Sequence, residues 1–126
     1  MEDKLEVGMY VRIKWGNGLQ TISQCKNIVN MGDTQYAKED FYIHTDHSGE
    51  VIYKTMIVKS SFDIIDILEV GDYVNGYPIY EIVEYEDDTR AIVIANDNKS
   101  IIWEKQDIKS VITHEQIEQM AYKAGE

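Results

Sequence analysis

One short segment of the sequence contains several side chains that commonly bind metals. His44-Thr45-Asp46-His47 places two imidazoles and a carboxylate within four residues. Zinc requires three or four ligands that converge in space, and in a strand His44 and Asp46 share one face while His47 points elsewhere. The chain has one cysteine and only one further histidine. We therefore interpret this segment as a solvated hairpin tip, and we predict no metal site.

Two other acidic segments invite a metal or catalytic interpretation. His114-Glu115 begins like the zinc-protease motif H-E-x-x-H, but Glu118 stands where the second histidine is required. We interpret His114 as an exposed residue in the first turn of a helix. The acidic run from Glu84 to Asp88 lacks the spacing and the glycine of a calcium-binding EF-hand loop. It is interpreted as a solvated turn, as is Asn96-Asp97-Asn98.

The motifs of nucleophilic and nucleotide chemistry are absent from the sequence. Gly16-Asn17-Gly18 precedes Leu19-Gln20-Thr21 and not the Lys-Ser/Thr of a phosphate loop, so it predicts a hairpin turn. No Gly-x-Ser-x-Gly occurs. Cys25 has no partner at a redox spacing, and we interpret it as a small buried side chain. We predict a protein that is not an enzyme and needs no cofactor.

Charge is the strongest bulk property of the chain. The net charge is −11 over 126 residues, and residues 64–126 carry −9 of it. Phosphate contacts need clustered Lys and Arg, so generic binding to nucleic acid or to an anionic membrane is not expected. The charged start MEDKLEVG, the single cysteine and the lack of a long apolar run favour a cytoplasmic location. The acidic second half instead suits a partner protein with a basic surface.

Most of the chain shows the periodicity and the turn signals of β-structure. Met56-Ile57-Val58 is expected to continue the strand before it, and Tyr73-Val74 precedes Asn75-Gly76, a strong two-residue turn signal. The other predicted strands are Met9–Trp15, Leu19–Ile28, Phe41–His44, Val51–Lys54, Tyr77–Tyr85, Ala91–Ala95 and Ser100–Glu104.

One helix is predicted, at the C-terminal end of the sequence. Thr113 and Gln116 have the spacing of a capping box. An apolar stripe at helical spacing should pack this helix onto the β-structure; it consists of Ile117, Met120, Ala121 and Ala124. Residues 27–39 are interpreted as an inserted loop with about one helical turn.

The sequence contains an internal repeat. LEVGMYV at Leu5–Val11 and LEVGDYV at Leu68–Val74 match at six of seven positions, with Met9 against Asp72. Two congruent endings, at 62–68 and 106–112, support a duplication. We predict three parts, at residues 1–67, 68–112 and 113–126. They are a first β unit with an inserted loop and a long hairpin, a second and more acidic β unit, and a C-terminal helix packed on the β-structure.

These segments resemble two groups of known proteins. A unit of this size with short strands and the phrase LEVGxYV is similar to SH3-like barrels of the translation-factor and KOW type. DIIDILEVGDYVNGYPI and DIKSVITHEQIEQMAYKAGE resemble small proteins encoded by phages and prophages of Gram-positive bacteria. The resemblance to phage and prophage proteins covers most of residues 57–126, and it implies a phage or prophage origin and a cytoplasmic location in the bacterial host. The similarity to SH3-like barrels implies tandem SH3-like repeats. Neither resemblance supplies catalytic residues.

Our first hypothesis is a non-enzymatic binding protein that inhibits a host antiphage defence protein. Acidic side chains would mimic the phosphates that such a protein expects, and tyrosines beside them would act as anchors. The predicted binding residues are Tyr77, Tyr80, Glu81, Glu84, Tyr85, Glu86, Asp87 and Asp88.

Two alternatives remain open at this point. One is a homo-oligomeric sponge that sequesters a nucleotide immune signal, with aromatic side chains stacking the base and cations gripping the phosphates. Its candidate residues are Arg12, Lys14, Trp15, Arg90 and Trp103. The other is a virion or assembly accessory protein. A homodimer or higher oligomer is compatible with exposed strand edges.

Overall fold

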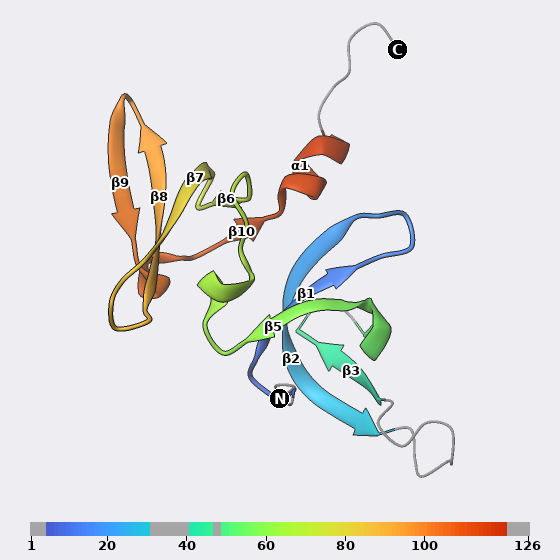
Figure 1. Cartoon of the computed structure of the whole chain (residues 1–126). Coiled ribbons are helices and arrows are strands. Elements are labelled where there is room, and N and C mark those ends of the chain that lie inside the picture. The colour runs from blue at the N-terminus through green and yellow to red at the C-terminus, as the bar shows by residue number, and fades with distance from the viewer. Residues whose placement is uncertain (1–4, 31–40, 47–48, 121–126) are drawn as a thin grey trace, which may run out of the picture.

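A computed structural model describes residues 5–30, 41–46 and 49–120 of the chain. The first part forms one antiparallel sheet in the order β4-β3-β2-β1-β5. Figure 1 shows this sheet in blue to green, beside the yellow to orange second sheet. Its strands are Tyr10–Lys14 (β1), Gln20–Asn30 (β2), Phe41–Thr45 (β3), Val51–Tyr53 (β4) and Ile57–Ser61 (β5).

The second sheet repeats this strand order. It runs β10-β6-β7-β8-β9, so in both sheets the fifth strand lies beside the first and the fourth lies at the far edge. A short 3-10 helix lies between the fourth and fifth strands of each unit, Lys54–Met56 (η1) in one and Lys105–Asp107 (η3) in the other. The strands are Tyr73–Val74 (β6), Tyr77–Glu84 (β7), Arg90–Asn96 (β8), Lys99–Trp103 (β9) and Val111–Ile112 (β10).

Two further helical segments follow the fifth strands. A 3-10 helix at Ile64–Ile67 (η2) leads from β5 to the second sheet, and the α-helix His114–Met120 (α1) follows β10. The prediction of a mainly β protein with one C-terminal helix is therefore confirmed. Neither sheet closes into a barrel within the described residues, because β4 and β5 are the edges of one and β9 and β10 the edges of the other.

The two matched phrases occupy the same place in the two sheets. Gly8 and Gly71 both have φ of 99°, a conformation that glycine adopts without strain. Gly8 donates its N–H to the carbonyl of Cys25 at 2.8 Å, and Gly71 donates to that of Ile79 at 2.9 Å. Each glycine thus turns the chain into the first strand of its sheet in the same way.

Four local predictions are wrong. Met56 lies in η1, and β5 is a separate strand that pairs with β1 and does not continue β4. Residues 27–30 belong to β2 and pair with β3, so they are not part of a loop; 31–39 lie outside the described residues. Strand β10 was not expected. The endings at 62–68 and 106–112 are not equivalent, because Asp63 caps η2 whereas Asp107 ends η3.

Each sheet covers its own apolar core. Val11 and Ile13 of β1 belong to the first core, together with Cys25, Ile43 and Ile52. The second core consists of Ile65, Leu68, Val74, Ile79, Ile92 and Ile94. Ile22 of β2 packs against this second core although it belongs to the first sheet. The outer face of the first sheet is thus in contact with the second unit.

The capping box of α1 is present as predicted. Gln116 donates its N–H to Thr113 Oγ1 at 3.2 Å, and Thr113 donates its N–H to Gln116 Oε1 at 3.0 Å. Thr113 is fully buried, and its hydroxyl donates to the carbonyl of Gln20 in β2. Ile117 is half-buried, while Ala121 and Ala124 lie outside the described residues. The cap therefore also ties the helix to the first sheet.

No helix within residues 5–30, 41–46 and 49–120 has the length and apolar character of a membrane span.

Cys25 is buried in the first core, and this makes a simple prediction about its reactivity. Burial raises the pKa of the thiol, although the contact with the carbonyl of Asn27 opposes that shift. We expect the folded protein to react with a disulfide reagent such as Ellman's only as fast as it opens, whereas the denatured chain reacts at once. Rapid stoichiometric labelling of the folded protein would contradict the buried position.

Candidate functional site

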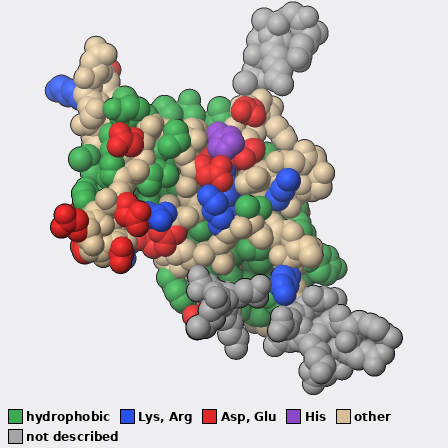
Figure 2. Space-filling model, viewed as in Figure 1, with side chains coloured by type: hydrophobic (Ala, Val, Ile, Leu, Met, Phe, Trp, Pro, Cys, Tyr) green, Lys and Arg blue, Asp and Glu red, His purple; other side chains and the backbone are tan. Residues whose placement is uncertain are grey.

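The residues predicted to bind a partner lie together on β7 and on the turn that follows it. All eight are exposed. A register shift against β8 between Ile79 and Glu81 breaks the alternation of the strand, so Tyr80 and Glu81 both face solvent. Figure 2 shows acidic side chains gathered over the turn between β7 and β8, on the left. We call these residues the acidic face: Tyr77, Tyr80, Glu81, Glu84, Tyr85, Glu86, Asp87 and Asp88.

The turn in the acidic face is held by its own hydrogen bonds. Asp87 Oδ1 accepts from the Thr89 hydroxyl at 2.6 Å and from the Thr89 N–H at 3.1 Å. These bonds lower the pKa of Asp87, and Asp88 adopts a positive φ of 67°. The acidic side chains therefore project from an ordered turn.

The residues proposed for nucleotide binding are dispersed in local contacts. Lys14 is exposed, but Trp15 is half-buried and donates its Nε1–H to Thr21 Oγ1 at 3.0 Å. Trp103 is half-buried against Tyr77, with ring centroids 6.1 Å apart. Arg90 lies 3.7 Å from Asp66 and 4.0 Å from Glu84 in ion pairs that are about two-fifths exposed or more.

Arg12, the fifth of those residues, cannot grip a ligand on the surface. Its side chain is 0% exposed, and all of its N–H groups point to partners within the protein. The prediction that Arg12 contacts a nucleotide is therefore corrected. Its burial follows from the strand pattern, because Val11 and Ile13 face the first core while Arg12 faces the second unit.

The guanidinium of Arg12 joins four segments of the chain. Nε donates to Gln20 Oε1 at 2.6 Å, Nη1 donates to the Ile67 carbonyl at 3.1 Å and to Asp72 Oδ2 at 2.7 Å. Nη2 donates to Asp72 Oδ1 at 3.2 Å and to Glu115 Oε1 at 3.0 Å. This uses all five donors, and the fork-to-fork pair with Asp72 is the geometry that arginine forms best with a carboxylate.

Asp72 is as fully engaged as its partner. Besides Arg12, it accepts the N–H of Glu69 on Oδ2 at 2.8 Å and the N–H of His114 on Oδ1 at 2.9 Å. Within the described part of the chain, no buried side-chain nitrogen or oxygen lacks a hydrogen-bond partner. A buried ion pair is tolerated when its remaining polar atoms are satisfied in this way.

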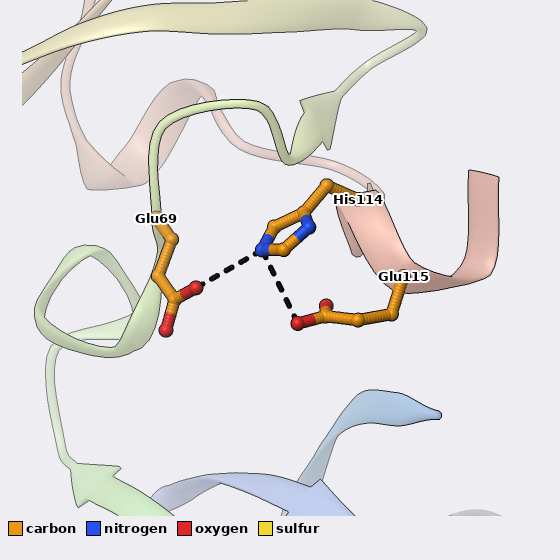
Figure 3. Close-up of side chains that lie close together, drawn as sticks. All are labelled: Glu69, His114 and Glu115. Carbon is orange, nitrogen blue, oxygen red and sulfur yellow. Dashed lines mark hydrogen bonds and ion pairs between the residues drawn. The ribbon is translucent and has the colours of Figure 1, made fainter. Parts of the chain in front are cut away.

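Beyond this pair, two more carboxylates and a histidine meet at the start of α1 (Figure 3). His114 Nε2 lies 3.1 Å from Glu69 Oε1 and 3.2 Å from Glu115 Oε2. Lys59 Nζ lies 3.2 Å from Glu69 Oε2. We call this group the Arg12 cluster: Arg12, Lys59, Glu69, Asp72, His114 and Glu115.

Glu69 of the Arg12 cluster is a poor candidate for a catalytic acid. Desolvation alone would raise the pKa of Glu69, but the hydrogen bond with His114 and the charges of Arg12 and Lys59 outweigh it, so the pKa is lowered. Glu69 therefore stays ionised at neutral pH. The pKa of Arg12 is raised in spite of its burial, because of the hydrogen bond and the charge of Asp72. Both groups are therefore held in their charged forms.

The segment first considered for metal binding does not assemble a site in the residues that are described. His44 packs edge-on against Tyr42, with ring centroids 5.6 Å apart. Asp46 Oδ1 accepts the N–H of Gln24 at 3.0 Å, and so it ties the residue after β3 to β2. His47 lies outside the described residues.

Sequence reasoning missed the Arg12 cluster, although one signal for it was present. Asp72 stands where the first repeat has Met9, and both positions are buried. A buried carboxylate needs a partner of opposite charge, and the first predicted strand carries two cations, Arg12 and Lys14, between its apolar residues. The change from Met9 to Asp72 therefore predicts a cation beside Asp72, but the pattern does not say which one. His114, by contrast, was expected to be exposed but is half-buried.

No protein-family model matches the chain, and no curated protein or solved structure is significantly similar to it.

Proposed function

We propose that this chain is a non-enzymatic, phage-encoded binding protein that acts in the cytoplasm of the bacterial host. Its most plausible target is a host antiphage defence protein with a basic surface, which it would inhibit. The observation that carries the proposal is the exposure of all eight residues of the acidic face on one strand and its ordered turn. An arrangement of this kind presents charge and aromatic area without a cost of ordering a loop.

The chemistry of the acidic face supports a protein partner. Tyr80 is 57% exposed and Tyr85 44% exposed, although each carries a large ring that would gain from burial. Carboxylates beside exposed tyrosines offer long-range attraction to Lys and Arg and a short-range anchor. Arg90 lies next to the acidic side chains, but it is already paired with Asp66 and Glu84. The acidic face therefore keeps an excess of negative charge.

A hollow beside the turn extends this surface. It has a volume of about 370 Å³, and Tyr85, Asp87 and Glu104 line it. Arg90 and Lys105 also line it. A basic side chain of a partner could insert between the carboxylates of Asp87 and Glu104.

The fold that we propose for each unit is an SH3-like barrel. Three observations support it: five short antiparallel strands, a fifth strand that pairs with the first, and a 3-10 helix between the fourth and fifth strands. Small barrels of this kind are common binding modules. The nucleotide sponge has less support, because Arg12 is buried and fully paired.

Reversing the charge of the acidic face tests the proposal. The variant Glu81→Lys, Glu84→Lys, Glu86→Lys should lose binding to the host partner by about tenfold or more, since electrostatic complementarity is replaced by repulsion. The partner is defined by capture from host lysate at low salt followed by a binding titration with the purified protein. Phage challenge of a defended host that expresses each variant gives the functional measurement.

A matched control has the same change in charge at other exposed positions. Glu6→Lys, Glu50→Lys, Glu118→Lys alters three exposed carboxylates outside the acidic face. This variant should bind and protect like the wild type. If lysate yields no partner at low salt, or if both variants lose binding equally, the acidic face is not the binding surface.

A further inference from the structure

Three potential metal ligands converge at the start of α1. Glu69, His114 and Glu115 each offer one ligand atom, and these three atoms lie within 4.8 Å of one another. The imidazole nitrogen is 3.1 Å from one carboxylate oxygen and 3.2 Å from the other. Ligand atoms about 2.0–2.1 Å from a tetrahedral zinc ion are about 3.3 Å apart. The two histidine–carboxylate distances are thus close to the spacing of a zinc ion's ligands, and the two carboxylate oxygens lie within 4.8 Å of each other.

The outer oxygen of each carboxylate is held by a cation. Glu69 Oε2 faces Lys59 Nζ at 3.2 Å, while Glu69 Oε1 faces the histidine. Glu115 Oε1 accepts from Arg12 Nη2 at 3.0 Å, while Glu115 Oε2 faces the histidine. Partners of this kind orient the ligands of a metal and fix which oxygen points inward. In Figure 3 the inward oxygens and the imidazole point toward one another.

The position of His114 is set by the backbone around it. Its N–H is bonded to Asp72, and a Cβ at Gly71 would be in van der Waals contact with the His114 Cβ, at 3.5 Å. Gly71 has φ of 99°, which an L side chain rarely adopts. The backbone and Cβ of His114 are therefore held in place next to the turn that carries Glu69.

The first repeat lacks these ligands. A Cβ at Gly8, the counterpart of Gly71, would lie 3.5 Å from the ring of Phe62, so an aromatic side chain stands where the second unit has His114. Glu6 precedes Gly8 as Glu69 precedes Gly71, but it is exposed. Among the residues that the structure describes, the potential ligands thus meet in the second unit, where the repeat diverged.

We propose that Glu69, His114 and Glu115 bind one zinc ion, which ties the turn before β6 to the start of α1. One imidazole with two carboxylates suits zinc and the neighbouring transition metals better than calcium or magnesium, which prefer oxygen ligands alone. With neutral His114, the Arg12 cluster has one more negative than positive charge. Three protein ligands leave a fourth position for water.

Calorimetric titration with zinc chloride tests this proposal on the full chain, prepared without a histidine tag and stripped with chelator. We expect one zinc ion per chain and a rise in the melting temperature measured by circular dichroism. His114→Gln should weaken zinc binding at least tenfold and abolish the rise. Cobalt should bind at the same site with a visible absorption band that zinc removes.

His44→Gln is the matched control, since it removes another half-buried histidine far along the chain and should bind zinc like the wild type. Glu115→Gln and Glu69→Gln guard against a fold defect in His114→Gln, because each should weaken zinc binding while the melt without metal stays cooperative. The proposal is overturned if zinc has no effect, if His114→Gln binds zinc normally, or if binding depends on His44. In those cases Glu69, His114 and Glu115 form a hydrogen-bonded bridge without a metal.

Discussion

Replacing Arg12 by methionine is expected to destabilise the protein by about 3–5 kcal/mol, the range seen when one partner of a buried ion pair is removed. Asp72 would remain at 0% exposure without its counterion. The carbonyl of Ile67 and Oε1 of Gln20 would also lose their donor. Urea unfolding followed by tryptophan fluorescence gives the free energy of unfolding of each variant.

The matched control is Arg90→Met in the second sheet. The Arg90 side chain is 38% exposed, and its carboxylate partners lie at 3.7 and 4.0 Å. Exposed pairs of this kind contribute about 1 kcal/mol or less. A loss on Arg12→Met no larger than that on Arg90→Met would contradict the buried position of Arg12.

A double variant separates the ion pair from the rest of the contact. Asp72→Met alone leaves the Arg12 charge with Glu115 and Glu69 as its remaining carboxylates and should also be costly. The double variant Arg12→Met, Asp72→Met removes both buried charges, and apolar replacements of buried pairs are often neutral or stabilising. We expect it to be more stable than either single variant; additive losses would show that the two charges are not coupled.

Methionine is the natural choice at position 72 because the first repeat already has it there. Met9 is 7% exposed, and its Sδ accepts the N–H of Glu6 at 3.3 Å. Asp72 accepts the N–H of Glu69 with the same spacing of three residues. The turn can therefore hold either side chain, and the second unit uses the carboxylate to bind the first.

Local chemistry was sufficient to predict the hairpins. Asn75 and Gly76 adopt φ of 53° and 90°, as the turn signal required, and β6 and β7 pair directly across them. Where the sequence pattern failed, pairing partners distant in the chain decided the structure. The local pattern of residues 57–61 is that of an extended strand, and it does not distinguish a continuation of β4 from a new strand. Pairing with β1 makes these residues a separate strand, β5.

The Arg12 cluster could not be predicted from spacing because its members are distant in the sequence. Arg12 and Asp72 are 60 residues apart, and Arg12 and Glu115 are 103 apart. Periodicity assigns each of them to a face of its own element, but it does not say which elements pack together. The exposed acidic face, in contrast, lies within one strand and one turn, so local pattern was enough to place its side chains in solvent.

The second large effect is expected from the two cores. Ile13→Ala in the first core and Ile92→Ala in the second each remove a fully buried side chain and should cost about 2–5 kcal/mol. Val58→Ala is the control, since Val58 is 46% exposed. Differential scanning calorimetry gives the melting temperature and the number of transitions for each variant.

We expect both core variants to lower one shared transition, because the two units are joined across a row of side chains on the first sheet. Ile22 and Lys59 are the cross-strand neighbours of Arg12. Ile22 packs on the second core, Arg12 pairs with Asp72, and Lys59 pairs with Glu69. Loss of either core exposes this row and removes its partners.

Two separate transitions, each shifted by only one of the core variants, would show that the units unfold independently. In the variant Arg12→Met the same experiment becomes more discriminating, because the buried ion pair no longer joins the units. If the Arg12 cluster is the main link, calorimetry of Arg12→Met should resolve or broaden the transition that is single in the wild type, whereas Val58→Ala should leave it unchanged. The shape of the melt thus measures how far a single buried arginine makes two repeats into one cooperative protein.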